Sequence, residues 1–233
     1  MEEENILDFN FWPSFSDLML SLVLILVLVL FLVSAILNVG TINLSHVENN
    51  QQKMIDTIGR MFGVSPEGSR TEEGLYMIPT SPGREGDIFI KNEPTVQKIT
   101  FSSNILFPPD EIQLNERGKR VLKIVGEILK KNIKLIREIQ IQGHADPTPT
   151  RRYESNMHLA SMRAISVFNF LNDELQIDPI ENLMSITSFG EYKPVQRSED
   201  ETNYRPEILA MHNRTSAMKE RNRRIELLLF YHY

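Results

Sequence analysis

One long apolar run dominates the N-terminal part of the chain. Across residues 18–37 the only polar side chains are those of Ser21 and Ser34. A helix rises 1.5 Å per residue, so about 20 apolar residues cover the roughly 30 Å of a bilayer core. Aromatic residues precede the run, as they do at membrane interfaces. The pattern predicts a single membrane-spanning helix over residues 13–37, preceded by a short tail, residues 1–12.

One acid, Asp17, lies near the start of this apolar helix. An ionised carboxylate at that depth costs on the order of a few kcal/mol unless it meets water, a partner or a proton. Ser14, Asp17 and Ser21 follow helical spacing and line one face, and a polar stripe on a lone spanning helix implies a neighbour or an aqueous path on that side. The alternative is a capping box, in which Ser14 and Asp17 only satisfy amide groups at the start of the helix.

Residues 38–63 continue with helical periodicity. Their apolar positions are three and four apart, and a glutamine interrupts them. This spacing predicts an amphipathic connector helix, and we favour one that pairs with a second copy of the chain. The alternative is a helix that lies on a membrane or on its own domain. The stripe consists of Leu44, Val47, Gln51, Met54, Ile58 and Met61.

A linker and then an α+β pattern follow. Residues 64–95 are rich in Gly, Pro, Ser and charged residues, which predicts a linker with short edge strands at residues 75–78 and 88–90. From residue 96 the pattern alternates between strands and helices, and two helices on one face of a mixed sheet are expected. The strands are predicted at residues 96–101, 138–142, 183–189 and 225–231, and the helices at residues 114–131 and 155–175.

Composition excludes several classes of function. The chain has no cysteine, and its formal net charge is −6 from 25 basic and 31 acidic residues. Five of the acids and none of the bases precede residue 38, so the remainder is nearly neutral and has no electrostatic footprint for nucleic acid. No lysine or arginine precedes Lys53, so the excess of these residues that marks the cytoplasmic side of a membrane helix does not set the orientation of this one.

We expect no enzymatic activity and no cofactor, because the sequence has no Gly-rich phosphate loop or nucleophile–base pair. We also expect no metal site, because the spacing of His144, Asp146 and His158 fits none.

Five short motifs follow one another after residue 100. They are Phe101–Phe107 (FSSNILF), Gly143–Asp146 (GHAD), Asn156, Arg163–Ala164 and Asn222–Glu226 (NRRIE). Together they resemble the OmpA/MotB family of peptidoglycan-binding domains, although Ala145 stands where that family usually has threonine. The resemblance implies a βαβαββ domain over residues 96–233.

The resemblance also implies a binding site for the peptidoglycan stem peptide. Asp146 and Arg163 would hold its diaminopimelate, with Asn156 and His144 as further candidates from the same motifs. The chemistry fits, because a zwitterionic end needs a carboxylate for its ammonium group and a guanidinium for its carboxylate. The alternative is that Asp146 only caps the turn and that Arg163 only pairs with it. Two departures from the family are the loop at residues 147–152 and the insertion at residues 191–220. The insertion has no predicted function, but it contains a candidate helical turn at residues 207–211.

The two halves together resemble MotB-type stator subunits, whose Phe-Ala-Asp-Phe-Met corresponds to Phe15–Met19. ZorB of the Zorya anti-phage defence systems has the same plan, and the acidic tail and the Trp12–Ser14 start favour it. The resemblance implies a homodimer inside a ring of five MotA/ZorA-like subunits, with ion flow through Asp17 driving rotation. It also implies a bacterial inner-membrane protein with a cytoplasmic N-terminus and the domain outside the cytoplasm. The alternatives are a flagellar-type stator subunit and a passive tether between membrane and cell wall.

Overall fold

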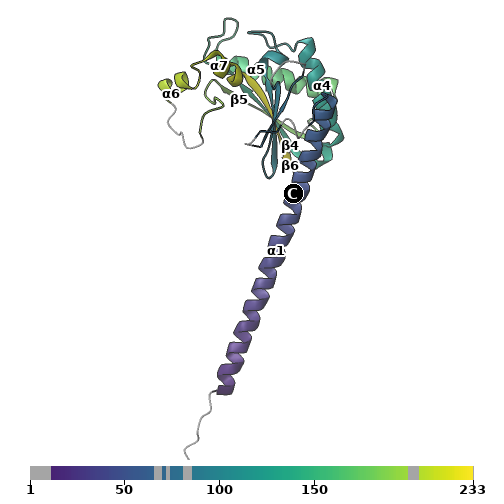
Figure 1. Cartoon of the computed structure of the whole chain (residues 1–233), viewed down its shortest axis with the longest axis vertical. Helices are drawn as coiled ribbons and strands as arrows, with labels where there is room; N and C mark the ends of the chain where they lie inside the picture. The colour runs from purple at the N-terminus through teal and green to yellow at the C-terminus, as the bar shows by residue number, and fades with distance from the viewer. Residues whose placement is uncertain (1–11, 66–69, 72–73, 81–85, 199–204, 233) are drawn as a thin grey trace, which may run out of the picture. The chain divides into compact units, whose positions relative to one another are not determined.

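The computed structural model describes residues 12–65, 70–71, 74–80, 86–198 and 205–232 (Figure 1). The chain divides into two compact units, residues 1–45 and residues 46–233. In the first unit the described residues form the N-terminal part of helix α1, Trp12–Met61. This helix is long and apolar enough to cross a membrane, and none of its most apolar stretch is buried among the described residues. The helix is continuous through residue 38, where the sequence suggested a boundary between span and connector.

The second unit is built on a six-stranded mixed sheet. Its strands are β1 (Leu75–Ile78), β2 (Ile88–Asn92), β3 (Val96–Ser102), β4 (Ile136–His144), β5 (Leu183–Gly190) and β6 (Arg224–Tyr231). The strand order is β1-β2-β3-β6-β4-β5, in which only β4 and β5 pair in parallel. The predicted mixed sheet is confirmed. The prediction that residues 88–90 form an edge strand is wrong, because β2 lies between β1 and β3 and bonds to both.

Helices connect the strands in the predicted order. They are α3 (Ser103–Leu106), α4 (Glu116–Lys131), η1 (Ile133–Leu135), α5 (Asn156–Asn169), η2 (Phe170–Glu174), α6 (Pro206–Met211) and α7 (Ser216–Asn222). Helix α4 begins where the side chain of Asn115 accepts a hydrogen bond from the Gly118 amide at 2.7 Å, which satisfies one of the unpaired amides of the first turn. Helix α5 continues as the π-helical turn η2, so the two together fill the helix predicted over residues 155–175.

One face of the sheet carries the hydrophobic core. Register places Ile99 of β3, Leu227 of β6 and Ile141 of β4 side by side, and all three are buried. Buried side chains of α4, α5 and the last turns of α1 belong to the same core. The opposite face presents polar residues such as Lys98 and Gln140, which are half-buried. Two predicted helices therefore do cover one face, and the end of α1 adds a third.

The last turns of α1 pack on this chain's own sheet. Val47, Met54 and Ile58 are buried, and so is Gln51. The side-chain amide of Gln51 donates to the backbone carbonyl of Glu93 at 2.9 Å. The backbone carbonyl of Gln51 accepts from the side-chain amide of Gln97 at 3.0 Å. Four of the six stripe residues are therefore covered by the domain, whereas Leu44 and Met61 are exposed. The own-domain alternative is right for the covered part, and pairing with a second copy stays a prediction for the rest. The polar interruption in the stripe is explained by these hydrogen bonds.

Candidate ligand-binding site at the end of strand β4

The carboxylate of Asp146 lies just beyond the end of β4, and the chain itself binds both of its oxygens. Its Oδ1 accepts a hydrogen bond from the Thr148 amide at 2.6 Å. Its Oδ2 forms an ion pair with a terminal nitrogen of Arg223. The side chain of Asp146 is 2% exposed and that of Arg223 is 32% exposed. Asp146 is therefore closed off from solvent, and Arg223 covers it.

Arg163 of α5 is buried in the same part of the domain. Its Nε donates to the Glu111 carbonyl at 2.8 Å, and its other two nitrogens lie 3.4 Å from the Pro108 carbonyl and 3.5 Å from the hydroxyl of Ser103. Its guanidinium carbon lies 5.1 Å from the ring centre of Phe107. Burial lowers the pKa of Arg163 to about 10, while the nearby charge of Asp110 opposes this shift. Arg163 is therefore a buried cation at neutral pH.

Helix α5 lies close to β4 because of Gly143. A Cβ atom at this position would lie 2.1 Å from the carbonyl oxygen of Ala160, so no larger residue fits without moving the helix. At the start of α5, the hydroxyl of Ser155 accepts from the His158 amide at 3.1 Å. This packing holds Arg163 near Asp146, whose charge influences the pKa of Arg163. The charge of Asp146 is one of several that raise the pKa of Arg163, and a joint binding role of the two residues stays a prediction.

The partner of Asp146, however, is a residue that the sequence analysis did not assign to the site. Arg223 lies 77 residues further along the chain, in the NRRIE motif. The alternative in which Arg163 pairs only with Asp146 is wrong, because the hydrogen bonds of Arg163 go to Glu111, Ser103 and Pro108. The NRRIE motif could have pointed to Arg223, because it places two arginines at the start of β6, the strand that pairs with β4.

The side chain of His144 is buried beside the site. Its side chain is 0% exposed, stacks on Phe189 with ring centres 5.2 Å apart, and places Nε2 3.5 Å from a carboxylate oxygen of Glu226. Burial lowers the pKa of His144 to about 4. Burial would raise the pKa of Glu226, but His144 and Arg224 together hold it well below its usual value. His144 is thus part of a buried cluster of charged groups beside the site, and its assignment to ligand binding stays a prediction.

Asn156 lies at the start of α5 and is half-buried. Its amide group donates to the carboxylate of Glu191, just after the end of β5. This bond ties the start of α5 to the segment that follows β5. The structure therefore gives Asn156 a role in positioning the edge of the site.

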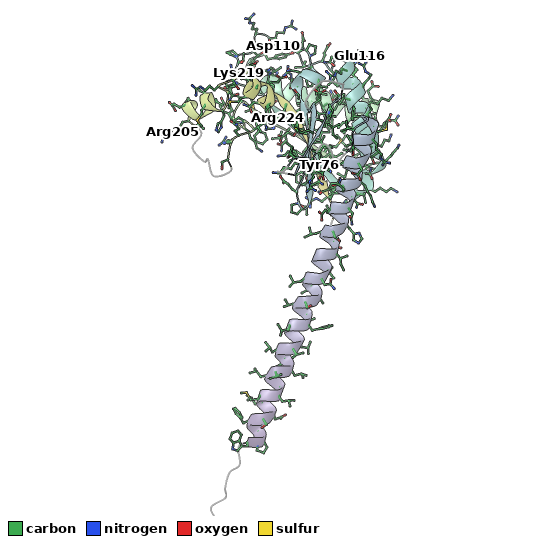
Figure 2. All side chains as sticks on the ribbon, viewed as in Figure 1. Tyr76, Asp110, Glu116, Arg205, Lys219 and Arg224 are labelled. Atoms are coloured by element: carbon green, nitrogen blue, oxygen red, sulfur yellow. The ribbon has the colours of Figure 1, made fainter. Side chains whose placement is uncertain are left out.

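The loop at residues 147–152 is fastened to the segment before α4. The hydroxyl of Thr150 donates to Asp110 at 2.5 Å, and the Arg151 amide donates to the same carboxylate at 3.0 Å. The hydrogen bond from Thr150 is the main reason that the pKa of Asp110 is lowered. On the other side, Lys219 of α7 lies 3.4 Å from the hydroxyl of Thr148. Figure 2 shows Asp110 and Lys219 at the same end of the domain.

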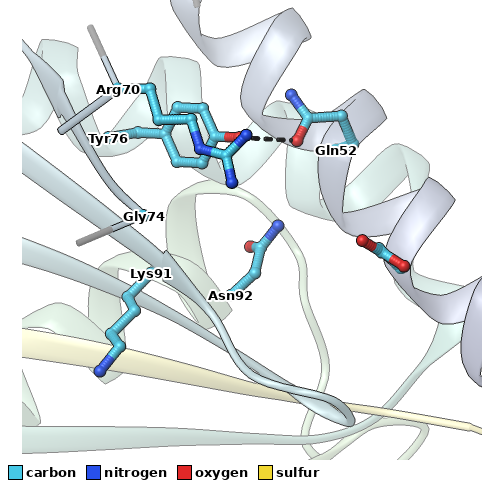
Figure 3. A pocket seen from close by; sticks show the side chains of 7 residues that line it. Gln52, Arg70, Gly74, Tyr76, Lys91 and Asn92 are labelled. Carbon is cyan, nitrogen blue, oxygen red and sulfur yellow. Dashed lines mark hydrogen bonds between the residues drawn. The ribbon is translucent and has the colours of Figure 1, made fainter. Parts of the chain in front are cut away.

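A second hollow lies between the last turns of α1 and the β1–β2 hairpin. Its volume is about 240 Å³, and Figure 3 shows Arg70 and Tyr76 opposite Gln52 at this hollow. The Tyr76 hydroxyl donates to Gln52 at 2.9 Å, and the guanidinium carbon of Arg70 lies 5.8 Å from the tyrosine ring centre. Glu48 and Lys91 bring opposite charges to its rim. No predicted site residue lines this hollow. Within the described residues, no group of three His, Cys, Asp or Glu side chains is placed to hold a metal ion.

In the first unit, Ser14, Asp17 and Ser21 are exposed on α1. The helix already includes Trp12, so Ser14 lies inside its first turn and not at the N-cap. The capping-box alternative is therefore wrong. The hydroxyl of Ser21 donates to the Leu18 carbonyl at 2.8 Å, so this polar group is satisfied by the helix itself.

The OmpA family model matches residues 106–205, which contain Asp146 and Arg163. Motility protein B of Bacillus subtilis (strain 168) is 28% identical over 133 residues, which cover 56% of this chain and 44% of that protein. The chain thus aligns with less than half the length of this relative. Residues 106–205 of the C-terminal unit are therefore similar to the OmpA family, and one similar protein is motility protein B.

Solved structures share the fold. A putative MotB-like protein from Desulfovibrio vulgaris superposes with a TM-score of 0.57 at 19% identity, covering 81% of this chain and 99% of that one. The periplasmic domain of Helicobacter pylori MotB gives 0.53 at 20% identity, covering 68% and 88%. The cell wall anchor of the T6SS from Pseudomonas aeruginosa gives 0.50 at 20% identity, covering 63% and 89%. At these identities the likeness concerns the fold alone.

Proposed function

We propose that this chain is the wall-binding, membrane-anchored subunit of an ion-driven motor. The observation that carries the proposal is the combination of an exposed acid on an apolar helix with an OmpA-family domain that has a MotB relative. The helix would cross the bacterial inner membrane once, with the N-terminus in the cytoplasm. The domain would then lie outside the cytoplasm, where peptidoglycan is found.

The domain would bind the peptidoglycan stem peptide at the end of β4. Asp146 supplies the carboxylate that an ammonium group needs, and Arg163 keeps a positive charge close to it. Asn156 holds the edge of this site by its bond to Glu191. The role requires binding and no bond-breaking chemistry, so we propose no enzymatic activity.

Asp17 would carry the ion, which we take to be a proton. Its side chain is exposed on α1, and no lysine or arginine precedes Lys53, so a second protein or water must stabilise its charge inside a membrane. A MotA-like or ZorA-like membrane subunit fits this need. We propose five copies of that subunit around two copies of this chain, with Asp17 protonated and released in turn. The acidic N-terminal tail favours a ZorB-like motor in anti-phage defence over a flagellar stator.

A second candidate function is a passive tether. The fold of the T6SS cell wall anchor from Pseudomonas aeruginosa resembles that of this domain, and an anchor needs no ion path. In a tether, Asp17 would be dispensable and only the domain would matter.

One experiment separates the motor from the tether. The chain is co-purified with its co-migrating membrane subunit, the copies are counted, and the complex is placed in vesicles that report proton flux. A motor gives two copies of this chain per assembly and a flux that disappears in Asp17→Asn while the complex still assembles. A single copy per assembly, or an unchanged flux in Asp17→Asn, would contradict the motor. Ser34→Ala, about 25 Å further along the helix from Asp17, is the control.

A further inference from the structure

The hollow between the last turns of α1 and the β1–β2 hairpin has room for a small molecule. Its volume of about 240 Å³ corresponds to roughly eight water molecules at about 30 Å³ each. Tyr76 is buried at this hollow, and its hydroxyl donates to the side-chain oxygen of Gln52 at 2.9 Å. The side-chain nitrogen of Gln52 donates in turn to the carboxylate of Asp56, also at 2.9 Å. These bonds fix one wall of the hollow and use up the polar groups of Tyr76 and Gln52.

The side-chain amide of Asn92 presents its nitrogen to the hollow. The backbone carbonyl of Gln51 can only accept, so the Gln97 atom that lies 3.0 Å from it must be the amide nitrogen. The same nitrogen lies 2.8 Å from Asn92, which must therefore accept with its oxygen. Figure 3 shows the nitrogen of Asn92 turned towards Arg70. A hydrogen-bond donor is thus held in place beside a guanidinium.

Three charged side chains reach the hollow from two sides. Arg70 and Lys91 come from the hairpin side, and Glu48 comes from α1. The guanidinium carbon of Arg70 lies 5.8 Å from the ring centre of Tyr76, and this cation–π contact keeps the guanidinium at the hollow. Among the described residues, none of these three side chains has an ion-pair partner. Two cations on one side and one acid on the other give the hollow a net charge of +1.

We propose that this hollow is a binding site for a small acidic α-amino acid. The α-carboxylate binds Arg70 and the amide nitrogen of Asn92, the ammonium group binds Glu48, and the side-chain carboxylate pairs with Lys91. Such a molecule has two carboxylates and one ammonium group, so its net charge of −1 complements that of the hollow. The inference does not rest on the wall-binding role, because no lining residue belongs to the site at the end of β4.

The charges of the hollow disfavour simpler ligands. A dicarboxylate without an ammonium group would place its negative charges near Glu48 with nothing to offset them, and a simple cation would meet Arg70 and Lys91. A bound amino acid also connects two elements, because Glu48 belongs to α1 and Asn92 to β2. Binding therefore stabilises the packing of the last turns of α1 on the sheet.

The test compares L-glutamate with two analogues that each lack one group. Glutarate lacks the ammonium group, and 4-aminobutyrate lacks the α-carboxylate. In a calorimetric titration at low salt, the full-length chain in nanodiscs should bind L-glutamate with a dissociation constant on the order of 1 mM. Each analogue should bind about tenfold more weakly, because each loses one charge-assisted contact.

Two variants assign these contacts to residues. In Glu48→Gln, the advantage of L-glutamate over glutarate should fall to about one, because the carboxylate that binds the ammonium group is gone. In Arg70→Gln, its advantage over 4-aminobutyrate should fall below about threefold, since only the neutral donor of Asn92 remains. Glu127→Gln and Arg120→Gln are the matched controls, because both residues are exposed on α4 outside the hollow, and both variants should keep the two ratios.

The proposal is overturned if the wild-type chain binds L-glutamate no better than glutarate or 4-aminobutyrate. It is also overturned if Glu48→Gln or Arg70→Gln keeps its tenfold ratio. Either result leaves the proposed function intact, because binding of the chain to peptidoglycan sacculi is measured separately and should be unchanged in both variants. Loss of each ratio in its own variant, with both controls unchanged, supports the site.

Discussion

Asp17 and Asp146 are two carboxylates in opposite situations. Asp146 is buried, and the chain supplies a backbone amide and a guanidinium for its two oxygens. Asp17 is exposed on α1, and the nearest lysine or arginine in the sequence is Lys53. The domain therefore provides partners for its own buried carboxylate, whereas Asp17 is exposed among the described residues.

The difference shows where function can be found in each unit. Within the chain, Asp146 already has a donor for each carboxylate oxygen. In the proposed membrane location, by contrast, Asp17 would need a proton, water or a partner. Changes at Asp146 should affect binding and folding of the domain, and changes at Asp17 should affect only what happens inside the membrane.

The largest expected effect is a complete separation of the two functions. Asp17→Asn should reduce ion flux of the reconstituted complex to the level of the membrane subunit alone, because an amide cannot take up and release a proton. Asp146→Asn should leave that flux unchanged in vesicles without cell wall, while binding to purified peptidoglycan sacculi is lost. Asp17→Glu, which keeps the titratable group, is the control and should retain part of the flux. Flux that depends on Asp146 in the absence of cell wall would break the separation.

A single methyl group at Gly143 should affect only the domain. Gly143→Ala places a Cβ against the carbonyl of Ala160, and overpacking of this kind costs about 3 kcal/mol. Because the obstacle is backbone, α5 must move away from β4 and carry Arg163 with it. Urea unfolding of the full chain in detergent, together with sacculus binding, measures both consequences.

Gly40→Ala is the control for that measurement, since a Cβ on Gly40 meets nothing within 4 Å. It should leave the urea midpoint of the domain unchanged. An unchanged midpoint in Gly143→Ala would mean that α5 can shift without cost, and the explanation of how Arg163 is held near Asp146 would fail.

Acid should weaken the domain through His144. Its pKa in the folded chain is about 4 against an ordinary value of 6.5, so the unfolded chain takes up the proton first as the pH falls. The free energy of unfolding that depends on neutral His144 is fully present above pH 6.5. It falls by roughly 3 kcal/mol between pH 6.5 and about 4, at 1.36 kcal/mol per pKa unit. Glu226, whose pKa is also lowered in the folded chain, adds to the loss at lower pH.

The measurement is the urea midpoint of the domain from pH 7 to pH 4. His144→Gln removes the titrating group and should flatten the decline, even if its stability at pH 7 is lower. His46→Gln is the control, because His46 is exposed on α1 and should leave the decline as it is. A decline that His144→Gln does not change would assign the acid sensitivity to other groups.

Strong periodicity made much of the fold predictable. Helix α4 and strand β3 have clear periods of 3.6 and 2, and both were found near their predicted bounds. Periodicity shows that a face is buried but not what covers it. The stripe that contains Val47 and Met54 was therefore assigned to a second helix, although it packs on the sheet. The length of β2 likewise could not show that it has a neighbour on each side.

The sequence predicted the acid of the candidate site, Asp146, but not the cation that pairs with it, Arg223. Asp146 follows directly from the GHAD motif, while its partner Arg223 is distant in the sequence and meets it only when β6 lies beside β4. Alternation along β4 places the side chain of His144 on the face opposite to Ile139 and Ile141, but it could not show that His144 is fully covered there.

The smallest expected effect concerns Ser21, and it tests how far the polar stripe of the helix matters beyond Asp17. The Ser21 hydroxyl already donates to the Leu18 carbonyl, so it can stay in an apolar surrounding without any partner protein. Ser21→Ala should then change ion flux by less than about threefold, the factor that corresponds to the roughly 0.6 kcal/mol of an average hydrogen bond between membrane helices. Ser34→Ala, on the other side of the helix, gives the baseline. A loss as complete as that of Asp17→Asn would mean that Ser21 gives up its backbone bond to serve the ion path, and the helix would then contain two essential groups instead of one.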